Sequence, residues 1–314
     1  MPSRHGFQRS ARARDIPIPA DRLRFGYAEE MKHTLLSLAA IVLGASLALG
    51  GRLRAPASSP EEEKAAYLGF DRNTYPGDER LAGLRKTFSY TGYWLNLPPG
   101  ASANTWEGRR AALRAVGFGF LVLFNGRLDA ELKKAADCGD LARSDAAAAI
   151  ADARREGFPK GTIIFLDQEE GGRMLPEQTA YINAWADGIN AGGFRAGVYC
   201  SGVPVPESRG VTVVTADDIR QNAGARRIAY WVANDACPPS PGCAFPKHVP
   251  SPAKSGVRFA EVWQFAQSPR RQDVAGGCKA SYDCDGNCYA PGERENRLFV
   301  DLNSAMSQDP SQGR

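Results

Sequence analysis

The segment IIFLDQEE, residues 163–170, is the feature that most restricts the fold and chemistry of this chain. Four apolar residues lead directly into Asp167, Gln168 and Glu169, a pattern typical of a buried strand that ends in acidic residues. Because side chains alternate across a strand, Asp167 and Glu169 are expected to project from the same face. Two such carboxyl groups suit glycoside hydrolysis, in which one protonates the leaving oxygen and the other stabilises the sugar cation, attacks it or activates water. A solvated turn after a strand would give the same local pattern.

Eight short apolar segments between residues 67 and 301 predict a parallel sheet, because their hydrophobic residues run continuously, as in strands buried on both faces. They are YLGFD (67–71), YTGYWL (90–95), FGFLVLF (118–124), TIIFLD (162–167), RAGVYC (195–200), IAYWVA (228–233), FAEVWQF (259–265) and RLFVD (297–301). Helical patterns at 104–116, 144–156 and 176–190 separate several of them. The alternation predicts a single α/β domain at 67–304, a (β/α)₈ TIM-like barrel, with an open doubly wound sheet as the alternative.

Acidic residues follow several of these strands. Asp71 ends the first, Asp167 and Glu169 follow the fourth, and Asp301 ends the eighth. The carboxyl ends of barrel strands meet at one mouth, so these acids are expected to form one site. Polar and aromatic residues that suit sugar binding end the fifth to seventh strands: Tyr199, Trp231, Asn234, Trp263 and Gln264. Each aromatic residue is also compatible with ordinary packing in the barrel.

The N-terminal region predicts export from the cytoplasm. Residues 1–54 carry nine Lys/Arg and four Asp/Glu, whereas residues 55–314 carry 30 and 31, so the domain itself has no basic excess and nucleic-acid binding is not expected. Residues 34–51 contain no charge, and Ala-Pro-Ala at 55–57 offers a cleavage site. We interpret 31–57 as a signal peptide or an uncleaved anchor that tethers the protein to a membrane through 35–51.

The remaining boundaries follow from composition. Residues 1–30 form a basic n-region or precede the true start, 58–66 a linker, and 305–314 a flexible tail. The protein is expected to be secreted or to reside in the cell envelope, and to be a monomer.

The seven cysteines agree with an oxidising compartment. Close spacing in two loops predicts disulfides within loop insertions, one between Cys237 and Cys243 and another within a second group: Cys278, Cys284 and Cys288. An odd number leaves one thiol spare, and Cys200 in an apolar strand is the candidate.

No metal or cofactor is expected. Only three histidines occur, at positions 5, 33 and 248, and none lies near a Cys-x-x-Cys pair that would favour zinc. Asp283, Asp285 and Asn287 resemble the start of a calcium loop, but its twelfth position holds Arg294 in place of the required glutamate.

The strand ends together resemble the glycoside hydrolase family 25 lysozymes, which are barrel-shaped muramidases. A closer likeness, which includes GFDRNTYPG (69–77), is to the glycoside-hydrolase-like domain of unknown function found in secreted bacterial proteins. The likeness spans 67–304 and rests on six motifs: GFD (69–71), DQE (167–169), GVYCS (197–201), YWVAND (230–235), VWQFAQ (262–267) and VDLN (300–303).

The resemblance implies a role for each matching residue. Glu169 would be the general acid, Asp167 would stabilise the oxocarbenium-like state or orient a nucleophile, and Asp71 would be the third acid. Asp301 would support them, and the sugar sites would be lined by Tyr199, Trp231 and Gln264.

Two hypotheses follow. The first is an exported glycosidase that acts on cell-envelope polysaccharide, peptidoglycan in particular. The second is a non-catalytic glycan-binding or regulatory envelope protein on the same barrel, because the first loop (Arg72 to Tyr75) and the cysteine-bearing insertions depart from the lysozymes.

Overall fold

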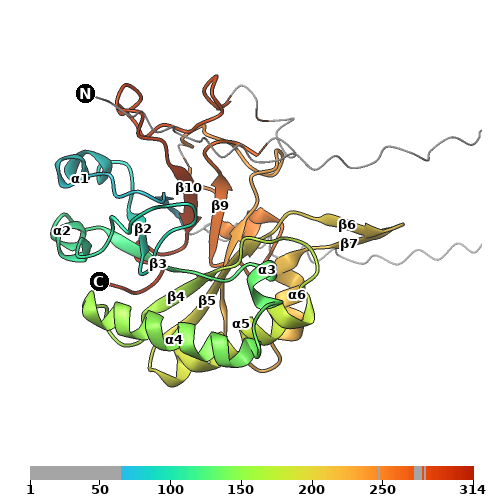
Figure 1. Ribbon diagram of the computed structural model, residues 1–314. Helices are drawn as coiled ribbons and strands as arrows, with labels where there is room; N and C mark the ends of the chain where they lie inside the picture. Colours follow the sequence, from blue (N-terminus) through green and yellow to red (C-terminus); the bar gives the residue numbers. More distant parts are fainter. Residues whose placement is uncertain (1–64, 247, 272–277, 279–280) are drawn as a thin grey trace, which may run out of the picture. The chain divides into compact units, whose positions relative to one another are not determined.

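A closed eight-stranded barrel forms the centre of the domain (Figure 1). The computed structural model describes residues 65–246, 248–271, 278 and 281–314, so the expected signal peptide or anchor lies outside the described residues. The strands follow one another around the barrel in this order: β1 (Tyr67–Asp71), β2 (Tyr90–Trp94), β3 (Gly119–Asn125), β4 (Ile163–Asp167), β5 (Arg195–Ser201), β8 (Ala229–Ala233), β9 (Val262–Ala266) and β10 (Asp301–Ala305). The predicted barrel is confirmed, and the open sheet is excluded because β1 pairs with β10.

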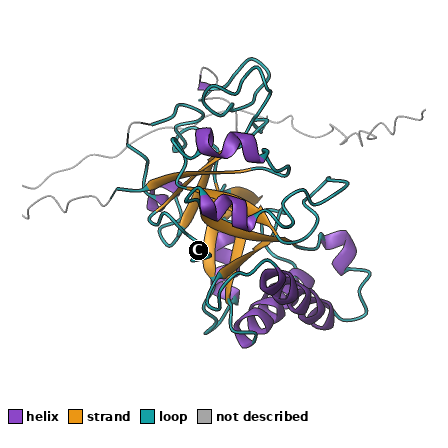
Figure 2. Cartoon of the chain, turned by 90° about the vertical axis from the view of Figure 1, so that its left-hand side faces the viewer, coloured by secondary structure: helices purple, strands orange, loops and turns teal. Residues whose placement is uncertain are grey.

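Helices lie outside the barrel, and the two long ones pack against each other beside β4 and β5 (Figures 1 and 2). The helical elements are α1 (Asp78–Leu84), α2 (Arg110–Ala115), α3 (Asp129–Leu132), α4 (Cys138–Arg155), α5 (Pro176–Ala191), α6 (Thr215–Asn222) and a 3₁₀ turn η1 (Pro252–Ser255). The predicted helices at 144–156 and 176–190 are thus α4 and α5, whereas only the second half of 104–116 is helical. An antiparallel hairpin, β6 (Val205–Ser208) and β7 (Val211–Val213), follows β5 and was not predicted.

The last barrel strand runs in the opposite direction to the one predicted. β10 begins at Asp301, four residues after the start of the expected segment 297–301, and it is antiparallel to both β1 and β9. A parallel strand would require a crossover that returns the chain to the other end of the barrel. The described residues between β9 and β10 contain no helix of this kind, so the chain re-enters from the mouth. Asp301 therefore lies at the mouth, beside Asp71, although it begins its strand.

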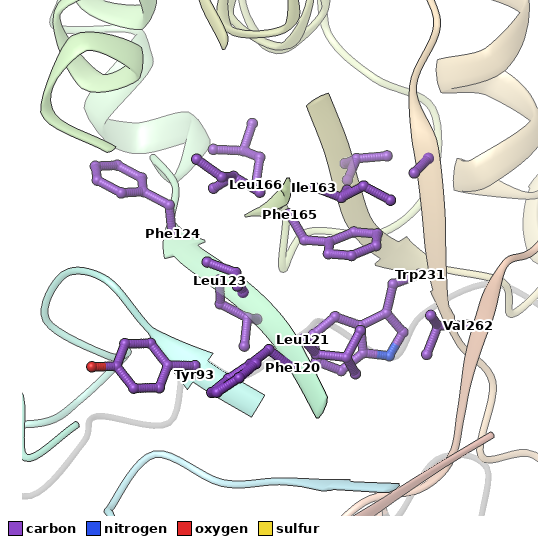
Figure 3. Close-up of a cluster of buried hydrophobic side chains, with 14 of the residues drawn as sticks. Tyr93, Phe120, Leu121, Leu123, Phe124, Ile163, Phe165, Leu166, Trp231 and Val262 are labelled. Carbon is purple, nitrogen blue, oxygen red and sulfur yellow. The ribbon is translucent and has the colours of Figure 1, made fainter. Parts of the chain in front are cut away.

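Large side chains fill the barrel interior. Phe165, Trp231 and Leu121 are fully buried, and Figure 3 shows them pointing toward one another. The rings of Phe165 and Trp231 meet edge to face with centroids 5.9 Å apart. Burial of each such side chain contributes about 1.5–3 kcal/mol, so the interior is a packed core and polar chemistry is confined to the mouth.

The C-terminal residues are docked, in contrast to the flexible tail expected at 305–314. The Ser311 N–H donates to Phe120 O at 2.8 Å, and the Ile163 N–H donates to Ser311 O at 2.8 Å. The Ser311 hydroxyl accepts from the Val122 N–H, also at 2.8 Å. These bonds pair backbone groups at the beginning of β3 and β4, which would otherwise be buried without partners.

Two disulfides join the loop after β8 to the loop after β9. They connect Cys237 with Cys278 and Cys243 with Cys288, with Cα–Cα distances of 5.5 and 5.4 Å. Both predicted bridges, the one between Cys237 and Cys243 and the one within the group of Cys278, Cys284 and Cys288, are therefore wrong, because two loops that are distant in sequence meet at the mouth. Cys200 is free and buried as expected, but it is accompanied by two further free thiols: Cys138 and Cys284.

We expect the Cys237–Cys278 bridge to make a large contribution to stability. It closes a loop with a sequence separation of 41, and loop-closure entropy predicts a loss of about 4 kcal/mol of unfolding free energy when both cysteines become serine. Urea denaturation monitored by intrinsic fluorescence measures this loss. The control is Cys138→Ser, which removes a free thiol, and equal stabilities of the two variants would contradict the prediction.

Within the described residues, no helix combines the length and apolar character that a membrane span requires.

Candidate active site

Four acidic side chains predicted from the sequence meet at one mouth of the barrel. Asp71 ends β1, Asp167 ends β4, Glu169 follows two residues later, and Asp301 begins β10. Each of Asp167 and Asp301 lies close enough to Asp71 and Glu169 for their charges to interact. The convergence of these carboxyl groups, expected from the strand ends, is present.

Asp167 and Glu169 form a hydrogen-bonded pair with unequal access to water. Asp167 is only 4% exposed, whereas Glu169 is exposed at the mouth. Burial, together with the neighbouring charges of Glu169 and Asp71, raises the pKa of Asp167 well above its usual value. Partial desolvation raises the pKa of Glu169, but its hydrogen bond with Asp167 opposes that rise. Of the two carboxyl groups, Asp167 therefore has its proton affinity raised more strongly, which favours Asp167 as the donor of their shared hydrogen bond.

Asp71 lies in a different environment, with amide donors directed at one of its oxygens. Asn303 Nδ2 donates to Asp71 Oδ1 at 2.7 Å, and Gln264 Nε2 donates to the same oxygen at 3.0 Å. Burial raises the pKa of Asp71 to about 6, while these two hydrogen bonds lower it. With a pKa of about 6, Asp71 is mostly a carboxylate at pH 7.

Two glycines make room for this arrangement inside the barrel. A Cβ on Gly69 would lie 2.1 Å from the ring of Tyr90, and a Cβ on Gly92 would lie 2.6 Å from Asp71 Cβ. Gly69 therefore admits the tyrosine ring, and Gly92 admits the aspartate to the barrel interior.

We expect Gly92→Ala to displace Asp71 and to destabilise the barrel by about 1–3 kcal/mol, because the methyl group has no free space. Thermal unfolding and a crystal structure of the variant measure both effects. Gly83→Ala on α1 is the control, since nothing lies within 4 Å of its Cβ position. Unchanged Asp71 coordinates and stability in Gly92→Ala would contradict the expectation.

The loop that carries Glu169 is held at several points. Glu170 Oε2 accepts from the Asp129 N–H at 2.8 Å and from Gln178 Nε2 at 2.7 Å. Further along, the Gly172 N–H donates to Thr215 Oγ1 at 2.7 Å. These bonds link the loop to α3, α5 and α6, so Glu169 lies on a loop whose position is fixed by hydrogen bonds to three helices.

A cleft of about 380 Å³ opens beside Glu169, which is within the range of small-ligand sites. One wall is apolar, and the others present amide, hydroxyl and guanidinium groups. Its lining consists of Gln168, Glu169, Gly171, Tyr199, Ser201, Val203, Val205, Ala233, Gln267 and Arg271.

Of the residues predicted to bind sugar, Tyr199 lines this cleft. Trp231 is fully buried, and Gln264 is 2% exposed and bonded to Asp71. Trp263 lies on the opposite face of β9 from Gln264, because side chains alternate along a strand, and its indole N–H donates to Asn234 O at 2.9 Å.

The remaining two predicted binding residues also have local partners. Asn234 is buried, and its Nδ2 donates to Ser255 O at 2.6 Å. Asp301 Oδ1 accepts from the Ser268 N–H at 2.6 Å.

Several mouth residues were missed from the sequence: Asn303, Gln267, Gln168 and Arg271. Asn303 follows Asp301 by two positions and so shares its strand face, a signal present in the VDLN motif. The pattern did not indicate Asn303 as a strand residue, because the predicted strand ends at residue 301.

The described part of the chain contains no group of three or more His, Cys, Asp or Glu side chains arranged to hold a metal ion.

The site thus combines a closed α/β barrel with acidic side chains gathered at one mouth. Residues 99–241 match the model of one family, the Rv2525c-like, glycoside hydrolase-like domain. The resemblance seen in the strand-end motifs is thereby confirmed. No curated protein matches the sequence.

Several solved structures are similar in fold. An uncharacterised protein of B. stearothermophilus has 19% identity and a TM-score of 0.49, with 76% of this chain and 95% of that chain covered. The Tat-secreted protein Rv2525c of Mycobacterium tuberculosis, crystallised with L-tartrate, has 13% identity and a TM-score of 0.45, with 80% of this chain and 100% of that chain covered. The modular autolysin LytC of Streptococcus pneumoniae has 12% identity and a TM-score of 0.43, with 76% of this chain and 46% of that chain covered.

Proposed function

We propose that this protein is an exported glycoside hydrolase that cleaves a cell-envelope polysaccharide, namely peptidoglycan. One observation carries the proposal: a buried carboxyl group with a raised pKa, Asp167, is hydrogen-bonded to an exposed one, Glu169, at the edge of an open cleft. The charged Asp71 lies beside them. Carboxyl groups whose environments separate their proton affinities are what acid-assisted cleavage of a glycosidic bond needs.

In the proposed mechanism, Glu169 is the general acid and donates a proton to the glycosidic oxygen as the C–O bond breaks. When a glycan covers the cleft, loss of water raises the proton affinity of Glu169, which then receives the proton from Asp167. Asp167 becomes a carboxylate and, with Asp71, stabilises the positive charge on the sugar. Water adds to the sugar, and the proton released restores the pair.

Support for export comes from the two disulfides, because such bonds persist in oxidising compartments. The protein would act outside the cytoplasm as a monomer, either released or tethered through residues 35–51.

The second candidate function is glycan binding without cleavage. It is favoured by the two disulfides that join the loops after β8 and β9, because these cysteine-bearing insertions depart from the lysozymes. Retention of the Asp167–Glu169 pair favours the hydrolase.

The test is incubation of the exported domain with purified cell walls, followed by measurement of new reducing ends and mass analysis of the fragments. The hydrolase predicts fragments with a newly formed reducing sugar. Wall binding without any new reducing end would establish the binding function and reject the hydrolase.

A further inference from the structure

A chain of hydrogen bonds behind the acids has only one consistent orientation. Trp231 Nε1 lies 2.9 Å from Asn303 Oδ1, and an indole nitrogen can only donate. The amide oxygen of Asn303 is therefore the atom facing Trp231, and its NH₂ group is the one facing Asp71 at 2.7 Å. Trp231 thus selects which end of the Asn303 amide Asp71 meets.

The second amide is fixed in the same manner. Tyr199 OH donates to Gln264 Oε1 at 2.7 Å, and Gln267 Nε2 donates to Tyr199 OH at 3.1 Å. Because the tyrosine oxygen already accepts a hydrogen bond, its own proton is free to point to Gln264. Gln264 then presents its NH₂ group to Asp71.

We propose that Trp231 is a positioning residue: its indole N–H holds the amide of Asn303 so that Asp71 meets only hydrogen-bond donors and is kept as a carboxylate. The importance of this for catalysis rests on the proposed function, in which Asp71 stabilises the sugar cation. Trp231 is fully buried and so acts through Asn303 and not by contact with substrate.

The surroundings of Asp71 make this orientation consequential. Asp167, Glu169 and Asp301 are carboxyl groups whose charges interact with Asp71, and none of them stabilises a second carboxylate. The hydrogen bonds from the two amides favour the charged form of Asp71. A reversed Asn303 amide would place an oxygen against the Asp71 oxygen.

The test is Trp231→Phe, which keeps an aromatic ring against Phe165 and Tyr199 but removes the N–H donor. The matched control is Trp185→Phe, since Trp185 is equally buried and its Nε1 has no hydrogen-bond partner. Titration of the Asp71 carboxyl carbon by ¹³C NMR should show a midpoint raised by about one pH unit in Trp231→Phe. It should not move in Trp185→Phe. The pH midpoint of the acidic limb in the pH profile for wall cleavage should shift upward by a similar amount.

Asn303→Leu tests the same hydrogen-bond chain by removing the amide that lies between Trp231 and Asp71. It should raise the Asp71 midpoint at least as much as Trp231→Phe, and adding Trp231→Phe to it should produce no further rise. Unchanged Asp71 midpoints in Trp231→Phe and Asn303→Leu would overturn the inference. A wild-type protein that cleaves no glycan would reject the proposed function, while the NMR titration would still decide the role of Trp231.

Discussion

Replacement of Glu169 by glutamine is expected to slow glycan cleavage by a factor on the order of 10²–10⁴, the usual contribution of a general acid. Glu169 combines exposure at the cleft with a hydrogen bond to Asp167, whose pKa is raised by burial. Glutamine keeps the size of the side chain but cannot transfer a proton, so the leaving sugar oxygen would depart as an alkoxide. Asp167→Asn should have the next largest effect and Asp71→Asn a smaller one, because Asp167 and Asp71 share the stabilisation of the sugar cation.

Initial rates of reducing-end release from purified walls, compared with equilibrium binding to the same walls, measure this effect. Binding should stay within a few-fold of the wild type, since only the proton is removed. Glu261→Gln is the control, because it makes the same chemical change at an exposed residue directly before β9, at the end of the strand opposite the mouth. A Glu169→Gln variant with wild-type rates would remove Glu169 from the mechanism, and loss of binding along with cleavage would assign it to substrate recognition.

Asp71→Asn is expected to make the protein more stable at pH 7 by on the order of 3 kcal/mol while it impairs cleavage. Burial raises the pKa of Asp71 from 3.8 to about 6. Above pH 6 the carboxylate is charged in both states, so folding carries the full free-energy penalty of burying it. Below pH 3.8 the group is neutral in both states and the penalty vanishes. The stability gained by the neutral amide should therefore be largest above pH 6 and should disappear as the pH falls below 4.

Urea denaturation of wild type and Asp71→Asn at pH 7 and at pH 4 tests this dependence. Asp217→Asn is the control, because Asp217 is exposed on α6. A variant that is less stable than the wild type at pH 7 would show that the two amide donors outweigh burial. A gain that does not change with pH would show that it does not come from the charge of Asp71. The expected result would mean that the barrel gives up stability to keep Asp71 charged, as active sites commonly do.

Much of the barrel could be predicted because parallel strands buried on both faces leave continuous apolar segments in the sequence. The segment at 163–167 coincides with β4, and Asp167 and Glu169 lie at the mouth because the strand ends there. Errors arose where chain direction depends on distant contacts. The run at 297–301 contains apolar residues, yet the strand starts at its last residue and runs the other way. Local composition does not show whether the preceding loop crosses the barrel.

The pairing of the cysteines also depends on contacts that are distant in sequence. Cys237 and Cys243 are near neighbours in sequence, but each is bonded to a cysteine 41 or 45 residues away. Pairing depends on which Cα atoms come within about 6 Å, and that distance is set by the fold of both loops.

The sequence by itself determined the barrel strands and the acids of the mouth, because each depends on a local run of residue types. Only the tertiary structure decided how these acids differ from one another. Asp167 is buried against Glu169, whereas Asp71 faces two amides from β9 and β10. Trp231, expected to contact sugar, instead orients one of those amides from inside the core. Proton affinity and hydrogen-bond direction depend on neighbours that are far apart in the chain, so they exist only once the barrel has closed.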